Sequence, residues 1–179
     1  MMPGRKAQER GYSQILWLYG PEEYVTEVGA MNVFFLFEKQ TTSGSGSNDG
    51  SKRRYELVTP PLTNGDILPG VTRQSILELT STWKNNNKND EEEEDYASLD
   101  VVERSLSMSE IKQSAIDGRL IEAFGAGTAA VVTPISHIQY RGEDIVIPAP
   151  GKLTQRLYND LVNIQYGIVD GPEGWSVRV

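Results

Sequence analysis

The sequence predicts a single domain of the α+β class, with strands and helices in an irregular, α/β barrel-like arrangement. A chain of 179 residues, 38% of them hydrophobic, is long enough for one sizeable core. The stretch 31–37 is almost continuously apolar, which is typical of a strand covered on both faces. Predicted strands and helices are mixed, without the strict β-α-β alternation of a doubly wound sheet. We therefore expect one domain over residues 1–179.

The first part of the chain is predicted to be mainly strand. A short polar helix at 3–10 comes first, with Pro3 in its first turn and Gly11 after its end. Turn residues then separate apolar segments that we expect to be strands. These strands are 14–19, 24–28, 31–38 and 55–60. The Gly/Ser-rich stretch 40–54 is typical of a flexible polar insertion within a hairpin.

The remainder of the chain is predicted to contain both helices and strands. Thr72 is a candidate N-cap, and Ser107 with Glu110 forms a capping-box pattern. The acidic stretch 85–95 is predicted to be a second flexible polar insertion. The expected elements are helices at 71–83, 107–118 and 152–165, and strands at 100–106, 120–140 with a break at 125–127, and 145–148.

Composition excludes several classes of function. The net charge of −8 and the pI of about 4.7 argue against a nucleic-acid partner, which requires a basic surface. The absence of cysteine excludes disulfides, thiolate metal sites and a cysteine nucleophile. We expect no metal site, because the chain has one histidine and no carboxylate cluster at ligand spacing. No apolar run reaches the roughly 18 residues of a membrane span, and the N-terminus does not read as a signal peptide.

Carboxylates within predicted strands require an explanation. Glu27 lies directly before the apolar run at 31–37, and burial of an unpaired carboxylate is strongly unfavourable. Either Glu27 is at an exposed strand edge or a cationic group lies beside it. Glu103 and Glu122 are single strand carboxylates that we expect to face solvent or to form ion pairs.

Two glycine-containing turns are candidate anion sites. In "LPGVTR", 68–73, a loop runs into a helix, so the amides of Val71 and Thr72 can either hold a phosphate or simply begin a capped helix. In "FGAGTAAVV", 124–132, the amides of residues 127–129 can either bind an anion or mark a structural bulge. Neither turn matches the P-loop or the dinucleotide-binding motif.

Four segments together resemble a known family. They are "WLYGPEEYVTEVGAMNVFF", "ELVTPPLTNGDILPGVTRQSILEL", "EAFGAGTAAVVTPI" and the later "IQYG" with its following "GW". They resemble the C-terminal half of the branched-chain amino acid aminotransferases, which are fold-type IV pyridoxal 5′-phosphate enzymes. The resemblance runs from about Ala7 to the C-terminus. D-amino acid aminotransferases and aminodeoxychorismate lyases share the fold, but "TEVGAMN" and "IQYG" fit the branched-chain enzymes better.

The resemblance implies specific roles. Glu27 would face the pyridine nitrogen of the cofactor, and Val71, Thr72 and Thr128 would hold its phosphate. The amides of Thr128 and Ala129 would face the substrate carboxylate. The implied reaction transfers the amino group of Leu, Ile or Val to 2-oxoglutarate, giving glutamate. The family also implies a homodimer, no membrane association, and a cytoplasmic or mitochondrial location.

This sequence also departs from the family's pattern at several positions. Family members carry the cofactor-binding lysine in a segment before the point where this sequence begins, so we expect a truncated chain without that catalytic residue. Lys6 matches the following helix and not that segment. The alternative is a non-catalytic module that binds the cofactor or a partner. Ala30 stands where many relatives have Thr, and Ala130 and Thr133 replace the Cys-x-x-Cys of some relatives. We assign Asn32 no catalytic role.

Overall fold

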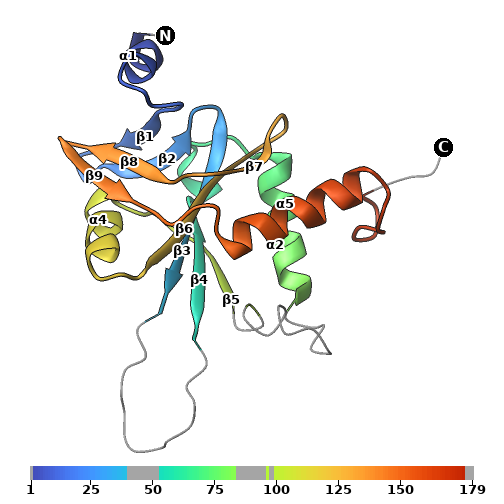
Figure 1. Cartoon of the computed structure of the whole chain (residues 1–179). Coiled ribbons are helices and arrows are strands. Elements are labelled where there is room, and N and C mark those ends of the chain that lie inside the picture. The colour runs from blue at the N-terminus through green and yellow to red at the C-terminus, as the bar shows by residue number, and fades with distance from the viewer. Residues whose placement is uncertain (1, 40–52, 84–95, 97–98, 176–179) are drawn as a thin grey trace, which may run out of the picture.

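The computed structural model describes residues 2–39, 53–83, 96 and 99–175. Helices and a mixed sheet confirm the α+β class (Figure 1). The strands are β1 (Leu16–Tyr19), β2 (Tyr24–Val28), β3 (Met31–Glu38), β4 (Tyr55–Thr59), β5 (Leu99–Glu103), β6 (Leu120–Gly127), β7 (Val131–Pro134), β8 (His137–Tyr140) and β9 (Glu143–Val146). The helices are α1 (Met2–Glu9), the 3-10 turn η1 (Leu62–Asn64), α2 (Val71–Trp83), α4 (Met108–Ile116) and α5 (Lys152–Gln165). The predicted insertions at 40–54 and 85–95 lie outside the described residues, except for 53 and 54.

Strand β3 is the centre of the seven-stranded sheet. β6 pairs with it antiparallel along one edge. Along the other edge, β2 pairs with the start of β3 and β4 pairs with its end, both antiparallel. The sheet therefore forks where β2 leaves β3 and β4 begins. β5 joins β4 in parallel and β7 joins β6 antiparallel, while β8 and β9 form a separate hairpin.

Strand β3 is buried on both faces, as its apolar run predicts. Phe35 and Phe37 pack on one face with α4 and the β8–β9 hairpin. Phe34 and Leu36 pack on the other face with α2 and α5. Figure 1 shows these two groups of elements on opposite sides of the sheet. Each of these four side chains is at most 3% exposed, and burying one contributes roughly 1.5–3 kcal/mol. Burial on both faces therefore stabilises β3, the strand from which β2 and β4 diverge.

Helix α2 connects two parallel strands. The chain leaves β4 at Thr59, passes through η1, and enters α2 at Val71 directly after Gly70. It then returns to β5, which lies beside β4 in parallel. This crossover places the first turn of α2 near the ends of β4 and β5. The helix covers the predicted segment 71–83, but it begins at Val71, so Thr72 lies inside its first turn and the predicted N-cap is wrong.

The glycines of "FGAGT" do not interrupt their strand, so the predicted break at 125–127 is wrong. Strand β6 runs through Gly127, and its antiparallel pairing with β7 makes residues 128–130 the turn of a hairpin. Both glycines pack closely against Met31, so a larger residue would force that side chain to move. A Cβ atom on Gly125 would lie 2.9 Å from the Met31 Cε, and one on Gly127 would lie 2.8 Å from the Met31 Cγ.

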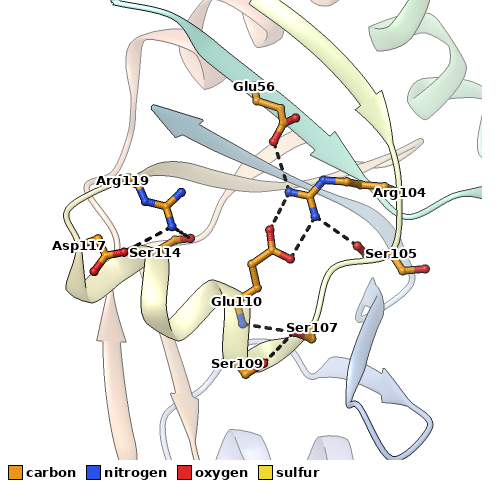
Figure 2. Close-up of polar contacts among 9 residues, drawn as sticks. All are labelled: Glu56, Arg104, Ser105, Ser107, Ser109, Glu110, Ser114, Asp117 and Arg119. Atoms are coloured by element: carbon orange, nitrogen blue, oxygen red, sulfur yellow. Dashed lines mark hydrogen bonds and ion pairs between the residues drawn. The ribbon is translucent and has the colours of Figure 1, made fainter. Parts of the chain in front are cut away.

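The start of α4 agrees with the predicted capping box in one of its two bonds. The Ser107 Oγ accepts a hydrogen bond from the backbone amide of Glu110 at 3.2 Å. The Glu110 carboxylate does not turn back to the Ser107 amide but binds Arg104, which also contacts Glu56 (Figure 2). Hydrogen bonding by Glu110 raises the pKa of Arg104 above its ordinary value. Two amides at this helix start are thus satisfied within the protein, that of Glu110 by the Ser107 hydroxyl and that of Met108 by the Glu23 carbonyl oxygen.

Candidate functional site

The end of the sheet at the fork collects the predicted site residues. Glu27 lies opposite Asn32 in the β2–β3 pairing, and Asn32 lies opposite Ala126 in the β3–β6 pairing. Directly opposed residues in neighbouring strands share a face of the sheet. Asn32 is two residues before Phe34, so this shared face is the one covered by α2 and α5. The turn that contains Thr128 and Ala129 follows β6 at the same end.

The β2–β3 hairpin binds both backbone polar groups of Leu68, its amide and its carbonyl. The Leu68 amide donates to the Glu27 Oε1 at 3.1 Å. The Asn32 Nδ2 donates to the Leu68 carbonyl oxygen at 2.9 Å. These two bonds bring the loop before α2 against the fork in the sheet. Glu27 is half-buried and accepts a neutral backbone donor, so it is neither at a freely exposed edge nor paired with a cation of the described residues.

The first turn of α2 presents unsatisfied amides. The Gln74 amide donates to the Gly70 carbonyl oxygen, which leaves the amides of Val71, Thr72 and Arg73 as the free donors of the helix start. Within the part of the chain that the structure describes, no side chain accepts from these three amides. The helix dipole adds partial positive charge at the same place. This turn therefore has the chemistry of an anion site.

A glycine is needed directly before this turn. A Cβ atom on Gly70 would lie 2.1 Å from the Asn32 Oδ1, which is far inside van der Waals contact. The buried Asn32 side chain, 5% exposed, thus occupies the space that a capping side chain at position 70 would need. Residues preferred at N-caps, such as Ser or Asp, are excluded there for steric reasons.

A groove of about 640 Å³ is lined in part by Gly70, Val71 and Arg73 of the same turn. Glu27 and Thr128 are not among its lining residues, so the groove does not coincide with the predicted site. The Trp175 indole closes part of it and donates to Glu78 at 2.8 Å. Hydrogen bonds from Gln74 and Trp175 hold the pKa of Glu78 below its ordinary value.

Two residues of the site were not predicted from the sequence. Asn32 was assigned no catalytic role, and its contact with Leu68 spans 36 positions. Arg73 was not singled out, yet it is 1% exposed, donates to the Pro60 carbonyl oxygen at 2.9 Å and forms an ion pair with Glu103. No local pattern marks Arg73, because its neighbours Thr72 and Gln74 are polar as well. Its partner Glu103 is ion-paired, which is one of the two outcomes that we expected for that carboxylate.

Glu122 contradicts its prediction. It is only 3% exposed and lies under the start of α5, and it forms no ion pair with another described residue. Its carboxylate accepts from the amides of Leu153 and Thr154 at 3.0 and 2.9 Å, and from the Thr154 hydroxyl at 2.7 Å. Three donors compensate the burial of the charge, and the negative carboxylate is favourable at the positive end of a helix.

Comparison with known proteins establishes the family. A family model described as amino-transferase class IV matches residues 1–138, which is more than half of the chain. The chain belongs to the class IV aminotransferases. A mitochondrial branched-chain-amino-acid aminotransferase of Saccharomyces cerevisiae is 44% identical over 184 residues, covering 100% of this chain and 41% of the yeast protein. Relatives in mouse are named mitochondrial and cytosolic.

Solved structures agree on the fold. The branched-chain amino acid aminotransferase of Escherichia coli has a TM-score of 0.60 and 24% identity, covering 97% of this chain and 44% of that one. A 4-amino-4-deoxychorismate lyase of Pseudomonas aeruginosa has a TM-score of 0.55 and 21% identity, covering 86% and 41%. The fold alone therefore does not choose between these activities. The class IV chain described here spans about two fifths of the length of the curated relatives that it matches. No helix among its described residues is long and apolar enough to cross a membrane.

Proposed function

We propose that this chain is the part of a branched-chain amino acid aminotransferase that holds pyridoxal 5′-phosphate. The observation that carries the proposal is the double contact of Leu68 with Glu27 and Asn32, because it brings a carboxylate and an open helix start to one place. The whole enzyme would transfer the amino group of Leu, Ile or Val to 2-oxoglutarate. The 44% identity to a yeast enzyme of that name supports this substrate class.

The residues present fit a phosphorylated pyridine. The amides of Val71 and Thr72, together with Thr128 on the β6–β7 turn, would hold the phosphate, since free amides at a helix start favour an anion. The Glu27 Oε1 is engaged by the Leu68 amide, and the Oε2 of the same carboxylate would hold the proton on the ring nitrogen. When bound, the cofactor supplies an electron-accepting ring for amino-group transfer. The Thr128 and Ala129 amides would orient the substrate carboxylate.

We further propose that Lys6 takes no part in this site. Lys6 lines a cavity of about 780 Å³ together with Val28 and Met31. Val28 and Met31 are the immediate neighbours of Glu27 and Asn32 along their strands, so their side chains point to the opposite face of the sheet. A lysine on that face cannot reach the ring that Glu27 would hold. Borohydride reduction with pyridoxal 5′-phosphate should therefore leave no pyridoxyl group on Lys6 in peptide mass spectrometry.

Binding to the 179-residue chain tests the proposal. We expect pyridoxal 5′-phosphate to bind at least tenfold more tightly than pyridoxal in calorimetric titrations, because the phosphate would meet free helix-start amides. Glu27→Gln should weaken both ligands, since it removes the charge beside the ring nitrogen. Equal affinity for the two ligands would refute the phosphate site. A whole enzyme assembled from this chain and an N-terminal half should form a homodimer and prefer Leu, Ile or Val over 4-amino-4-deoxychorismate.

The cellular compartment of the whole enzyme is part of the same proposal. Relatives named mitochondrial and cytosolic support either location for the whole enzyme. Fractionation of cells that express the whole protein decides between the two locations.

A further inference from the structure

The turn from Leu68 to Arg73 is fixed at both of its ends. At its start, Asn32 and Glu27 hold the carbonyl oxygen and the amide of Leu68. At its end, the Arg73 side chain passes under the first turn of α2. It donates to the Pro60 carbonyl oxygen and forms an ion pair with Glu103. Between these two ends lie Val71 and Thr72, whose amides have no side-chain acceptor among the described residues.

The partners of Arg73 belong to the two strands that α2 connects. Pro60 directly follows the last residue of β4, and Glu103 is the last residue of β5. These strands are paired in parallel, with Thr59 opposite Glu103. A single guanidinium therefore ties the first turn of the helix to the ends of both strands. This arrangement restricts the rotation of α2 about its own axis as well as its distance from the sheet.

The burial of Arg73 by itself adds little to the stability of the fold. Its side chain is 1% exposed, and its Nε has no hydrogen-bond partner among the described residues. Removing an arginine from water is costly, and an apolar side chain of similar size often stabilises a fold as well or better. An arginine at this position does offer something that an apolar side chain lacks, namely hydrogen bonds with fixed directions.

We propose that Arg73, acting through Glu103 and the Pro60 carbonyl, is a positioning residue that directs the amides of Val71 and Thr72 toward the phosphate group. This inference rests on the proposed function. Arg73 itself makes no bond to these amides; it donates to the Pro60 carbonyl oxygen after β4 and to Glu103 in β5. Its contribution is to hold the amide directions before the ligand arrives, so that the ligand does not have to order them.

The test is the phosphate preference of the 179-residue chain, defined as the Kd for pyridoxal divided by the Kd for pyridoxal 5′-phosphate. The variant combines Arg73→Met with Glu103→Gln, which removes the ion pair without leaving a buried charge unpaired. We expect its melting temperature to stay near that of the wild type, while its phosphate preference falls about tenfold. A residue that only stabilised the fold would not change this ratio.

The matched control combines Arg104→Met with Glu110→Gln. It removes both ion pairs of Arg104, the next arginine along the chain, with Glu110 and with Glu56. Among the described residues, Arg104 has no hydrogen bond or ion pair with the Leu68–Arg73 turn. Its phosphate preference should equal that of the wild type. An equal loss in the control would overturn the positioning role, because the effect would then not be specific to Arg73.

A second variant, Arg73→Lys, keeps the buried charge. It provides a test if the double variant does not fold. We expect a smaller loss of phosphate preference, since an ammonium cannot make both guanidinium contacts in the same geometry. An unchanged preference in a folded Arg73 variant overturns the positioning role and leaves the proposed function standing. No preference in the wild type refutes the proposed phosphate site, and the positioning role with it.

Discussion

The starts of α2 and α4 differ in how their free amides are satisfied. At α4, the Ser107 side chain accepts from the Glu110 amide, so the protein closes the helix start itself (Figure 2). At α2, Gly70 supplies no side chain, and no side chain of the described residues accepts from Val71 or Thr72. Both starts face the same physical demand, since the first amides of any helix lack partners within it. The difference leaves the first turn of α2 able to accept an anion, which is what the proposed function requires.

The start of α5 strengthens this comparison. Its amides at Leu153 and Thr154 are satisfied by Glu122, a buried carboxylate from β6. The same strand continues to the turn that contains Thr128, which is a predicted phosphate ligand. One strand thus closes one helix start with a carboxylate and ends beside the predicted anion site. Side chains of the described residues accept from amides at the starts of α4 and α5, whereas none accepts from the first amides of α2.

The largest expected effect is the loss of the carboxylate that closes α5. Glu122→Ala should lower the free energy of unfolding by about 3 kcal/mol, because it leaves three buried donors without an acceptor. Urea unfolding measures this loss. Glu122→Gln is the matched control and should cost less, since its amide oxygen can still accept.

The phosphate preference of Glu122→Ala sharpens the comparison. If α5 serves only the fold, the preference stays at the wild-type value under conditions where the variant is folded. A tenfold fall would show that the closed and open helix starts are not separate in function.

The second effect concerns the space before α2. Gly70→Ala should cost about 2 kcal/mol of unfolding free energy, because the new Cβ overlaps the Asn32 Oδ1. In an Asn32→Ala background, the same change should cost well under 1 kcal/mol, since the overlapping atom is gone. A double-mutant cycle by urea unfolding measures this coupling. Equal costs in both backgrounds would mean that Asn32 is not what keeps position 70 free of a side chain.

The smallest effect is expected at α4. Ser107→Ala should lower the free energy of unfolding by about 1 kcal/mol, the usual cost of losing an N-cap acceptor. Ser109→Ala is the control, because Ser109 is bonded to the Ser107 hydroxyl but caps no amide. Thermal unfolding of the two variants should separate them. Equal losses would remove the evidence that the Ser107 side chain closes this helix.

Local patterns in the sequence predicted the elements well. The apolar run at 31–37 predicted a strand covered on both faces, and β3 is such a strand. The helix at 152–165 was predicted with the observed bounds, and Ser107 caps α4 as its spacing indicated. These features depend on residues within a few positions of one another, which is the range over which periodicity and capping act.

The contacts that build the site depend on residues far apart in the sequence. Glu27 meets the Leu68 amide 41 positions away, and Glu122 meets Leu153 31 positions away. A strand carboxylate gives no local sign of whether solvent, a cation or a helix start will lie beside it, so the expectation for Glu122 was wrong. Likewise, the glycines at 125 and 127 remain within β6, because their small size accommodates Met31 from the neighbouring strand.

The most direct test of the open start of α2 is an amide NMR titration of the chain. On addition of pyridoxal 5′-phosphate, the signals of Val71 and Thr72 should shift, while those of Glu110 and Leu153 at the closed helix starts stay in place. Pyridoxal at the same concentration should leave Val71 and Thr72 nearly unchanged, because it carries no phosphate. The account is contradicted if Val71 and Thr72 do not respond to the phosphorylated ligand, or respond no more than Glu110 and Leu153.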